Sequence, residues 1–268
     1  MTSTAERAAT YLVLGLAAVL ALYPMLLILV TALSPDQVGA SGGLHVENFG
    51  TAWEQGNFGT YIKNSVLVSA TVVLLSAALA SLAGYAFGTM QFRGSSVLFY
   101  LLLLGLMVPS EAVVIPLYYD LKALNLTDSY FSLVFPQVAQ SLAFGTFWMR
   151  AHFRSASREV VEAARVDGAG HGRIFWSILL PMGRPALMTM VLLVFMWTWN
   201  EFLLPLVMIT DESLRTAPLG LSNFQGQYTS GTALLAAGAV LVALPVVVVF
   251  LFTQRHFIRG MVEGAVKG

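Results

Sequence analysis

The sequence predicts an all-α membrane protein with six transmembrane helices, and its composition and apolar patterning support this. Hydrophobic residues make up 57% of the 268 residues, whereas charged residues make up only 10%. An ordinary soluble domain carries about 25% charged residues, so this chain has too few polar side chains to cover a soluble fold of its size. Its apolar residues also gather in stretches of about 20, the length that a membrane-spanning helix needs. We therefore expect an integral membrane protein.

Six stretches have the length and composition of spanning helices. They cover roughly residues 11–33, 66–88, 97–118, 130–149, 186–209 and 232–253. The first stretch resembles a secretory signal, but its apolar run exceeds the ~7–15 residues of a signal core. We expect it to be retained as an anchor and residues 1–268 to form a single transmembrane domain.

Positive charges predict the orientation, because Lys and Arg are in excess in cytoplasmic loops. With the N-terminus inside, the outer loops carry only Lys63, Lys122 and Arg215. The inner segments carry all the other basic residues: Arg7, Arg93, Arg150, Arg154, Arg158, Arg165, Arg173, Arg184, Arg255, Arg259 and Lys267. We therefore expect both termini and the polar segment 150–185 to be cytoplasmic, and the loops 34–65 and 210–231 to lie outside.

The predicted spans contain proline breaks and one stripe of small residues. The prolines within or at the edges of spans are Pro24, Pro109, Pro116, Pro136, Pro205 and Pro245. Such breaks fit a bundle that bends or lines a cavity, although proline is also simply common in membrane helices. Ser76, Ala80, Gly84 and Gly88 recur every four residues in the second span. This spacing predicts close packing against another helix of the same chain.

Several kinds of chemistry are absent from the sequence. It contains no phosphate-binding loop or dinucleotide-binding glycine motif, and its histidines do not have metal-binding spacing. Without cysteine it has neither disulfides nor thiolate metal sites. Its net charge of zero gives no indication of nucleic acid binding. We expect neither catalysis nor a cofactor bound by this chain.

Two carboxylates, Glu111 and Glu201, lie within apolar stretches at similar distances from the predicted cytoplasmic helix ends. A charge near the middle of a spanning helix costs about 3 kcal/mol even on a lenient scale, so such groups face a bundle interior or water. One interpretation is that Glu111, Asn200 and Glu201 line or gate a polar translocation path. The alternative is that each acid forms a structural hydrogen bond with a neighbouring helix.

The cytoplasmic segment 150–185 predicts two short helices. Ser157 can cap the first, Glu162 lies near its positive end, and Gly168 can terminate it. Its small residues Ala163 and Ala164 would let another protein approach closely. In the second, an apolar face is expected to lie on the bilayer surface and to end at Pro181; it comprises Ile174, Phe175, Ile178 and Leu179. From the residues alone, an interfacial anchor without a partner remains an alternative.

The pattern E-A-A-x3-G-x9-I-x-L-P resembles the signature loop of permease subunits of ABC importers from bacteria and archaea. Its residues here are Glu162, Ala163, Ala164, Gly168, Ile178, Leu180 and Pro181, extended by Asp167 and Ala169 as in the carbohydrate-uptake branch. Residues 199–202 and the tail 254–268 also fit this branch. The chain is similar to the smaller, six-span permease of maltose-type systems.

This resemblance implies a non-catalytic subunit that moves a carbohydrate, a di- or oligosaccharide, across the bacterial cytoplasmic (inner) membrane. The implied partners are a second permease forming a heterodimer, two ATPase subunits and an extracytoplasmic solute-binding protein, besides membrane lipid. ATP and Mg²⁺ would bind the partner ATPase. The alternatives are a proton-coupled secondary transporter using Glu111 and Glu201, or an ABC importer for a non-sugar solute such as a glycerol phosphate.

The resemblance also implies roles for particular residues. A coupling helix between the fourth and fifth spans would insert into the ATPase, with Glu162, Ala163, Ala164, Asp167, Gly168, Ala169, Leu180 and Pro181 as coupling residues. The tail would contact the ATPase through Gly264, Ala265, Val266, Lys267 and Gly268. An outer loop would face the binding protein through Phe224, Gln225, Gln227 and Tyr228.

Overall fold

The computed structural model describes residues 4–35, 43–155, 158–224 and 231–265, and these contain helices and connecting turns. They divide into two compact units. The first unit comprises Met1–Gly59 and Leu219–Pro245, and the second comprises Thr60–Pro218 and Val246–Gly268. Two long helices, α3 (Phe58–Thr89) and α13 (Thr232–Ala265), contribute to both units.

A buried asparagine and a pair of stacked aromatic rings contribute to the packing of the first unit. It contains α1 (Thr4–Ala32), α2 (Glu47–Gln55), η3 (Leu221–Phe224) and the start of α13. Asn48 of α2 donates hydrogen bonds to the carbonyls of Ala32 and Ser34, both at 2.9 Å, and so satisfies acceptors at the end of α1. The rings of Phe58 and Phe224 stack with centroids 6.2 Å apart, and both side chains are buried.

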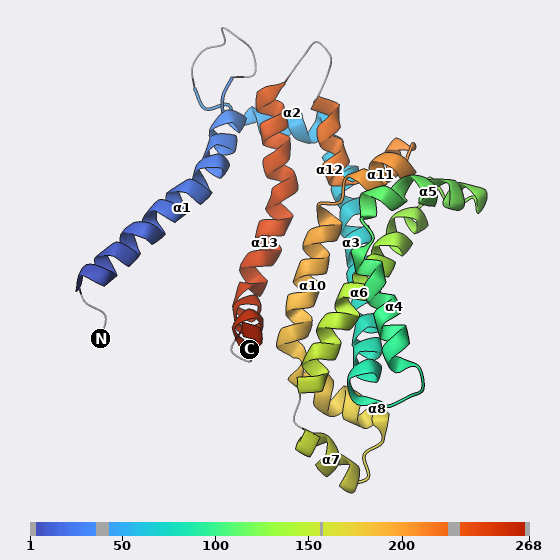
Figure 1. The fold of residues 1–268 in the computed structure, drawn as a ribbon. Coiled ribbons are helices and arrows are strands. Elements are labelled where there is room, and N and C mark those ends of the chain that lie inside the picture. Colours follow the sequence, from blue (N-terminus) through green and yellow to red (C-terminus); the bar gives the residue numbers. More distant parts are fainter. Residues whose placement is uncertain (1–3, 36–42, 156–157, 225–230, 266–268) are drawn as a thin grey trace. The chain divides into compact units, whose positions relative to one another are not determined.

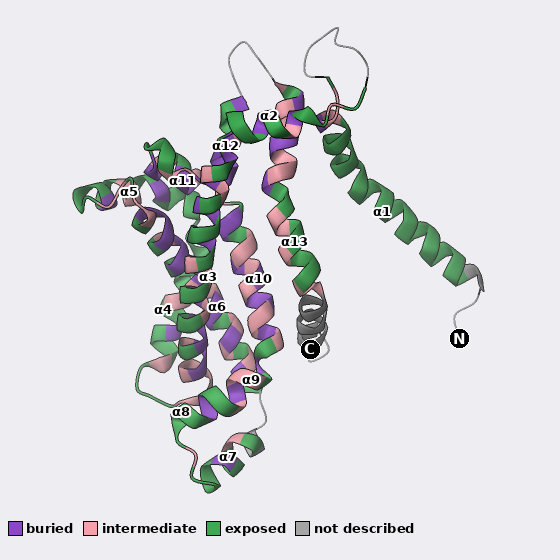
Figure 2. Ribbon diagram, turned by 180° about the vertical axis from the view of Figure 1, so that it is seen from behind, coloured by how far each residue is buried: buried purple, intermediate pink, exposed green. Residues whose placement is uncertain are grey.

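Most of α1 has no partner within the described part of the chain. Residues 6–30 are all exposed, as the green α1 helix in Figure 2 shows. The helix is nevertheless strongly apolar, which is the pattern of a surface covered by lipid or by another membrane chain.

The second unit is built around α6 (Tyr130–Ser155), which contacts α4 (Ser95–Met107), α10 (Arg184–Trp199) and α11 (Leu203–Met208). Its other elements are α5 (Ser110–Ala123), α7 (Arg158–Val166), α8 (His171–Ile174), η1 (Phe175–Leu179), α9 (Leu180–Met182) and η2 (Glu212–Leu214), with α12 (Ala217–Gly220) at the boundary. Figure 1 shows α7 and α8 at one end of this unit and α5 and α11 at the other.

The small-residue stripe of α3 packs against α6, as expected from its spacing. A Cβ atom added at Gly84 would lie 2.6 Å from the Met149 Cβ, and one added at Gly145 would lie 2.7 Å from the Ala80 Cβ. Contacts below 3.0 Å do not occur between real side chains, so the two backbones approach as closely as they do only because these positions carry glycine. The prediction of packing within the chain is confirmed.

The third expected span is sharply bent, and so is the segment that leads into the fifth. The third bends by 99° between α4 and α5, at Val108 and Pro109. The segment from α8 to α9 bends by 75° against α10 at Gly183. Pro24, Pro116, Pro136 and Pro245 lie inside helices, so a proline alone does not break the helix at those positions.

The described residues form an all-helical membrane protein with three to five candidate spans. Three helices, at Glu6–Ala32, Phe58–Thr89 and Thr232–Gln254, are long and apolar enough to cross a bilayer, and each bent pair could add one more. Helix α6, where the sequence predicts the fourth span, does not pass this test. Its buried face carries polar side chains, among them Ser132, Gln137, Ser141 and Thr146.

Candidate functional site

Helix α7 ends in a specific hydrogen-bonded cap. The amide of Ala169 donates to the Ala164 carbonyl at 2.9 Å, and the amide of Gly168 donates to the Arg165 carbonyl at 3.0 Å. This is the Schellman arrangement, which requires a left-handed residue just beyond the helix. Gly168 has φ +79°, as that position demands. The Ala-Ala and Asp-Gly-Ala parts of the sequence motif therefore form one capping unit.

The two sides of α7 differ in exposure. Ala164 is buried, and Val161 and Ala169 pack against the core of the second unit. Glu162, Ala163, Arg165 and Asp167 are exposed, and Val166 is 88% exposed. An exposed side that mixes apolar, small and charged side chains at the tip of the unit is suited to contact another protein.

The helix after α7 differs from the expectation at two points. Ile174, Phe175 and Leu179 are buried in the core rather than facing a bilayer surface, and Ile178 packs against the same core. Trp176 occupies the exposed side instead. The prediction of a membrane-facing apolar surface was therefore wrong.

The helix also continues through Pro181 and stops at Gly183. A π-helical turn, η1, precedes the proline, and within it the Leu180 amide bonds the Phe175 carbonyl. Pro181 has no backbone N–H to donate, and the wider π-helical turn lets the helix continue past this missing hydrogen bond. Leu180 packs against the core, so both residues connect the α7 end of the unit to α10.

Tyr85 of α3 fixes this segment to the helix bundle. Its hydroxyl lies 3.2 Å from His171 Nδ1 and donates to the His171 carbonyl at 3.3 Å. Its ring contacts Phe175 at 5.2 Å and Phe153 at 6.2 Å between centroids. Movement of α7 and α8 would therefore be transmitted to α3 and α6 through one aromatic cluster.

At the opposite end of the second unit, a pocket of about 520 Å³ brings Glu111 and Glu201 together. We call it the α5 pocket. Its polar side chains are Ser110, Glu111, Gln137, Gln140 and Glu201, and Phe135, Pro136 and several aliphatic residues complete its walls. None of its lining residues is Lys, Arg or His. Glu111 and Glu201 thus line one pocket, whereas Asn200 is not among its lining residues.

Each carboxylate of the α5 pocket lies at the start of a helix. Glu111 is in the first turn of α5, immediately after the 99° bend. Glu201 lies between α10 and α11, and its Oε1 accepts a hydrogen bond from the Leu204 amide at 3.0 Å. The positive end of a helix stabilises a negative charge, which reduces the cost of keeping both acids in a membrane protein. Asn200 donates to the Met196 carbonyl at 2.8 Å, a local helix-ending bond.

The sequence does not predict two polar clusters of the second unit. Asp128 accepts hydrogen bonds from the Thr210 amide and hydroxyl and from the Asp211 amide, and its own amide donates to Met208. The Thr210 hydroxyl, followed by the backbone donors, lowers the pKa of the Asp128 carboxyl below its ordinary value. This cluster fixes the chain that follows α11.

The second cluster centres on Asn64. Its amide donates to the carbonyls of Ser213 and Arg215 at 2.8 and 2.9 Å, and it accepts from the Tyr130 hydroxyl at 2.8 Å. Two of its partners lie about 150 residues away and Tyr130 lies 66 away, so no local signal indicates this role.

The other predicted site residues are only partly described. Phe224 is buried against Phe58, so its ring is not available to a binding protein. Gln225, Gln227 and Tyr228 lie outside the described residues, as do Val266, Lys267 and Gly268. Helix α13 extends to Gly264 and Ala265, whose side chains are not described.

Residues 80–262 match the family model described as "Binding-protein-dependent transport system inner membrane component". This range includes α7, its cap and the α5 pocket. The chain belongs to this family. It is therefore a permease subunit of the inner membrane and not an enzyme, and permeases of this family bind no cofactor. Family membership also contradicts the alternative of a proton-coupled secondary transporter.

Curated relatives and a solved structure agree with this assignment. The permease is 37% identical to the probable ABC transporter permease protein YurM of Bacillus subtilis (strain 168), over 84% of this chain and 74% of the relative. It is 32% identical to the maltodextrin transport system permease protein MdxG of the same organism, over 97% and 95%. It is 31% identical to the trehalose transport system permease protein SugB of Mycobacterium tuberculosis (strain CDC 1551 / Oshkosh), over 92% and 93%.

The fold matches a chain in the crystal structure of a bacterial ABC transporter that imports the acidic polysaccharide alginate. The TM-score is 0.78 at 23% identity, with 96% of this chain and 99% of the other covered. At this identity the match supports the fold alone.

Proposed function

We propose that the permease is the translocating subunit of an ATP-driven carbohydrate importer, equivalent to the smaller permease of a maltose-type system. It would pair with a second permease and work with two ATPase subunits and an extracytoplasmic solute-binding protein. The relatives named for maltodextrin and trehalose support a di- or oligosaccharide as the solute. ATP and Mg²⁺ would be bound only by the ATPase.

The observation that carries this proposal is the geometry of α7. A short, capped helix with an exposed, partly apolar side lies at the end of the second unit, away from the α5 pocket. We assign Glu162, Ala163 and Val166 to the ATPase contact. Ala164, Gly168 and Ala169 maintain the shape of the helix, while Leu180 and Pro181 connect it to α10.

The proposed topology has six spans in a single transmembrane domain, with both termini and α7 in the cytoplasm. The distribution of Lys and Arg supports this orientation. Helix α6 would be a span although it is more polar than the others, because its polar residues point into the helix bundle. The tail from Gly264 would reach the ATPase, and residues 225–228 would face the binding protein, with Phe224 anchoring the start of that loop.

The α5 pocket is the proposed solute path of this subunit. Its carboxylates and amides can accept and donate hydrogen bonds to sugar hydroxyls, and its apolar walls suit the faces of a pyranose ring. Because no basic residue lines the pocket, it offers no partner for a phosphate. The chemistry of the pocket therefore favours a neutral sugar over a glycerol phosphate.

Replacing Glu162 with Lys tests the coupling role. A reversed charge on the exposed side of α7 should reduce the amount of ATPase co-purifying with the permease by about tenfold, which corresponds to 1.4 kcal/mol. Sugar uptake should fall in parallel. Glu54→Lys, on the exposed surface of α2 in the first unit, is the matched control and should leave both unchanged. If Glu162→Lys retains ATPase and transports normally, α7 is not the coupling element.

A further inference from the structure

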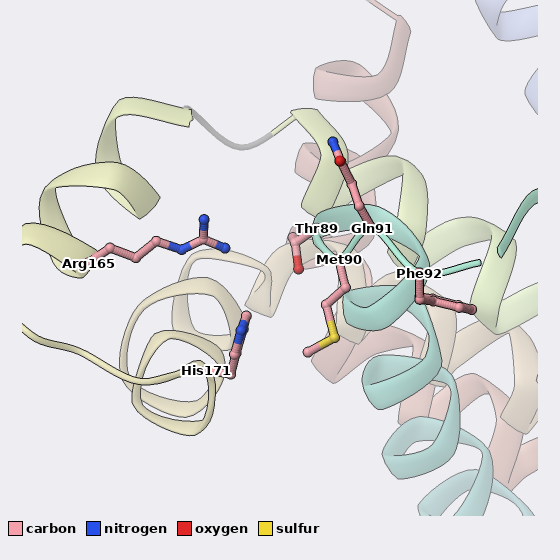
Figure 3. Close-up of a pocket in the computed structure, with 6 residues that line it drawn as sticks. All are labelled: Thr89, Met90, Gln91, Phe92, Arg165 and His171. Atoms are coloured by element: carbon pink, nitrogen blue, oxygen red, sulfur yellow. The ribbon is translucent and has the colours of Figure 1, made fainter.

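A second cavity lies beside α7, at the opposite end of the second unit from the α5 pocket. It measures about 560 Å³ and is lined by Thr89, Met90, Gln91, Phe92, Arg165 and His171. We call it the α7 pocket. The first four residues belong to the end of α3 and the turn that follows, Arg165 to α7, and His171 to α8. Figure 3 shows the Arg165 side chain extending from α7 toward Thr89 and His171.

The lining of the α7 pocket is basic and neutral, with no acidic residue. Arg165 forms no ion pair or hydrogen bond with any residue that the structure describes. His171 uses its Nδ1 toward Tyr85, and its Nε2 has no hydrogen bond within the described ranges. Gln91 adds a neutral amide at the rim. The cavity thus has one permanent positive charge and a second ionisable donor, both without a counter-ion among the residues that the structure describes.

We infer that the α7 pocket binds a phosphate group. A guanidinium matches phosphate oxygens through two parallel N–H donors, and an imidazole can supply a further donor. A phosphate that also carries a glycerol or sugar moiety would use more of the cavity than a free anion. The proposed topology places the pocket on the cytoplasmic side, where anionic lipid headgroups and phosphorylated solutes are both present. To that extent the inference rests on the proposed function.

Such a ligand would change the mechanics of α7. Arg165 is on α7, whereas His171 is hydrogen-bonded to α3 through Tyr85. A phosphate held by both residues would link α7 to the helix bundle across the turn at Gly168–Gly170. The bound ligand would stabilise α7 in this position and thereby influence how readily it follows the ATPase.

Hydrogen exchange of α7 tests the inference in the purified full-length permease in lipid nanodiscs. In one arm, glucose 6-phosphate is added to the permease in phosphatidylcholine discs, and sodium chloride at equal ionic strength is the control. The other compares phosphatidylglycerol with phosphatidylcholine discs without added phosphate. The first arm reports a soluble phosphate and the second a lipid headgroup. With ligand at ten times its Kd, exchange of the amides in 160–168 should slow by about tenfold in at least one arm.

The variants make the test specific. Arg165→Gln should abolish the slowing and Arg165→Lys should reduce it, because an ammonium cannot form the two-donor contact. Arg173→Gln removes an exposed charge of α8 that does not line the pocket, and it should behave as wild type. Slowing that persists in Arg165→Gln, or its absence from both arms, would overturn the inference. Protection that appears only when the ATPase is added would likewise overturn it, while leaving the proposed function intact.

Discussion

Gly168 determines where α7 ends, because its φ of +79° lies in a region that residues with a Cβ atom rarely adopt. Space is not the constraint, since nothing lies within 4 Å of a Cβ atom added there. The requirement is purely conformational, so substitutions at this position should rank by how well each residue tolerates a left-handed backbone.

We expect Gly168→Ala to destabilise the end of α7 by about 1–2 kcal/mol, and Gly168→Asn by clearly less, because Asn visits this conformation more easily. Hydrogen exchange of the Gly168 and Ala169 amides would measure the loss of the cap. ATPase co-purification should fall in the same order. Equal effects of Ala and Asn would mean that the left-handed cap at Gly168 is not required for the ATPase contact.

Glu201 has a structural role and a proposed role in transport, and two substitutions separate them. Gln keeps an oxygen that can accept the Leu204 amide but removes the charge, whereas Ala removes both. If the charge serves the solute path, Glu201→Gln should lower the rate of sugar uptake by about tenfold, with the amount of permease in the membrane unchanged. A tenfold change in rate corresponds to about 1.4 kcal/mol in activation free energy. Normal uptake by Gln with impaired folding of Ala would assign Glu201 to helix capping alone.

The residue-scale predictions succeeded where the signal was local and failed where it was not. The Asp-Gly-Ala sequence predicts the end of α7 because a cap involves residues within a few positions of one another. Glu111 and Glu201 stand out as charges in apolar runs, but the bends that put them at helix starts do not follow from composition. The Asp128 and Asn64 clusters join residues 66 or more positions apart, and only the folded chain reveals them.

At the level of helices, periodicity indicated an apolar face on residues 174–179 but not what covers it. A membrane surface and a protein core impose the same amphipathic pattern. In the structure Phe175 of this face contacts the rings of Tyr85 from α3 and Phe153 from α6. In α3 the small-residue stripe gave a correct prediction, because small residues every four positions have few uses other than close helix packing.

A pair of glycine-to-alanine substitutions tests the α3–α6 contact. At Gly84 the added Cβ would meet the Met149 Cβ at 2.6 Å and the Arg150 backbone nitrogen at 2.9 Å. We expect Gly84→Ala to destabilise the permease by about 1–3 kcal/mol, since the backbone must move. Gly105→Ala is the matched control, because its nearest neighbour would be 4.0 Å away. Thermal unfolding in detergent should show a lower Tm only for the first, and equal Tm values would contradict the close packing.

At the level of the whole molecule, composition predicted an all-helical membrane protein, and the structure agrees. The number of spans was harder to predict, because hydropathy assumes one straight helix per crossing. In the structure the third expected span bends by 99°, the chain bends by 75° just before the fifth, and α6 carries buried polar residues. A helix whose polar groups are satisfied inside a bundle does not need a uniformly apolar sequence.

The central claim is that α7 lies in the cytoplasm and contacts an ATPase, and the absence of cysteine makes a direct measurement simple. Ala163→Cys places one thiol on the exposed side of α7, and Leu124→Cys places one at the opposite end of the unit, after α5. A membrane-impermeant thiol reagent added to intact cells should label Cys only at position 124. A short cross-linker should join position 163 to a subunit with ATPase activity. Labelling of position 163 from outside, or no cross-link to an ATPase while sugar uptake is normal, would contradict the account.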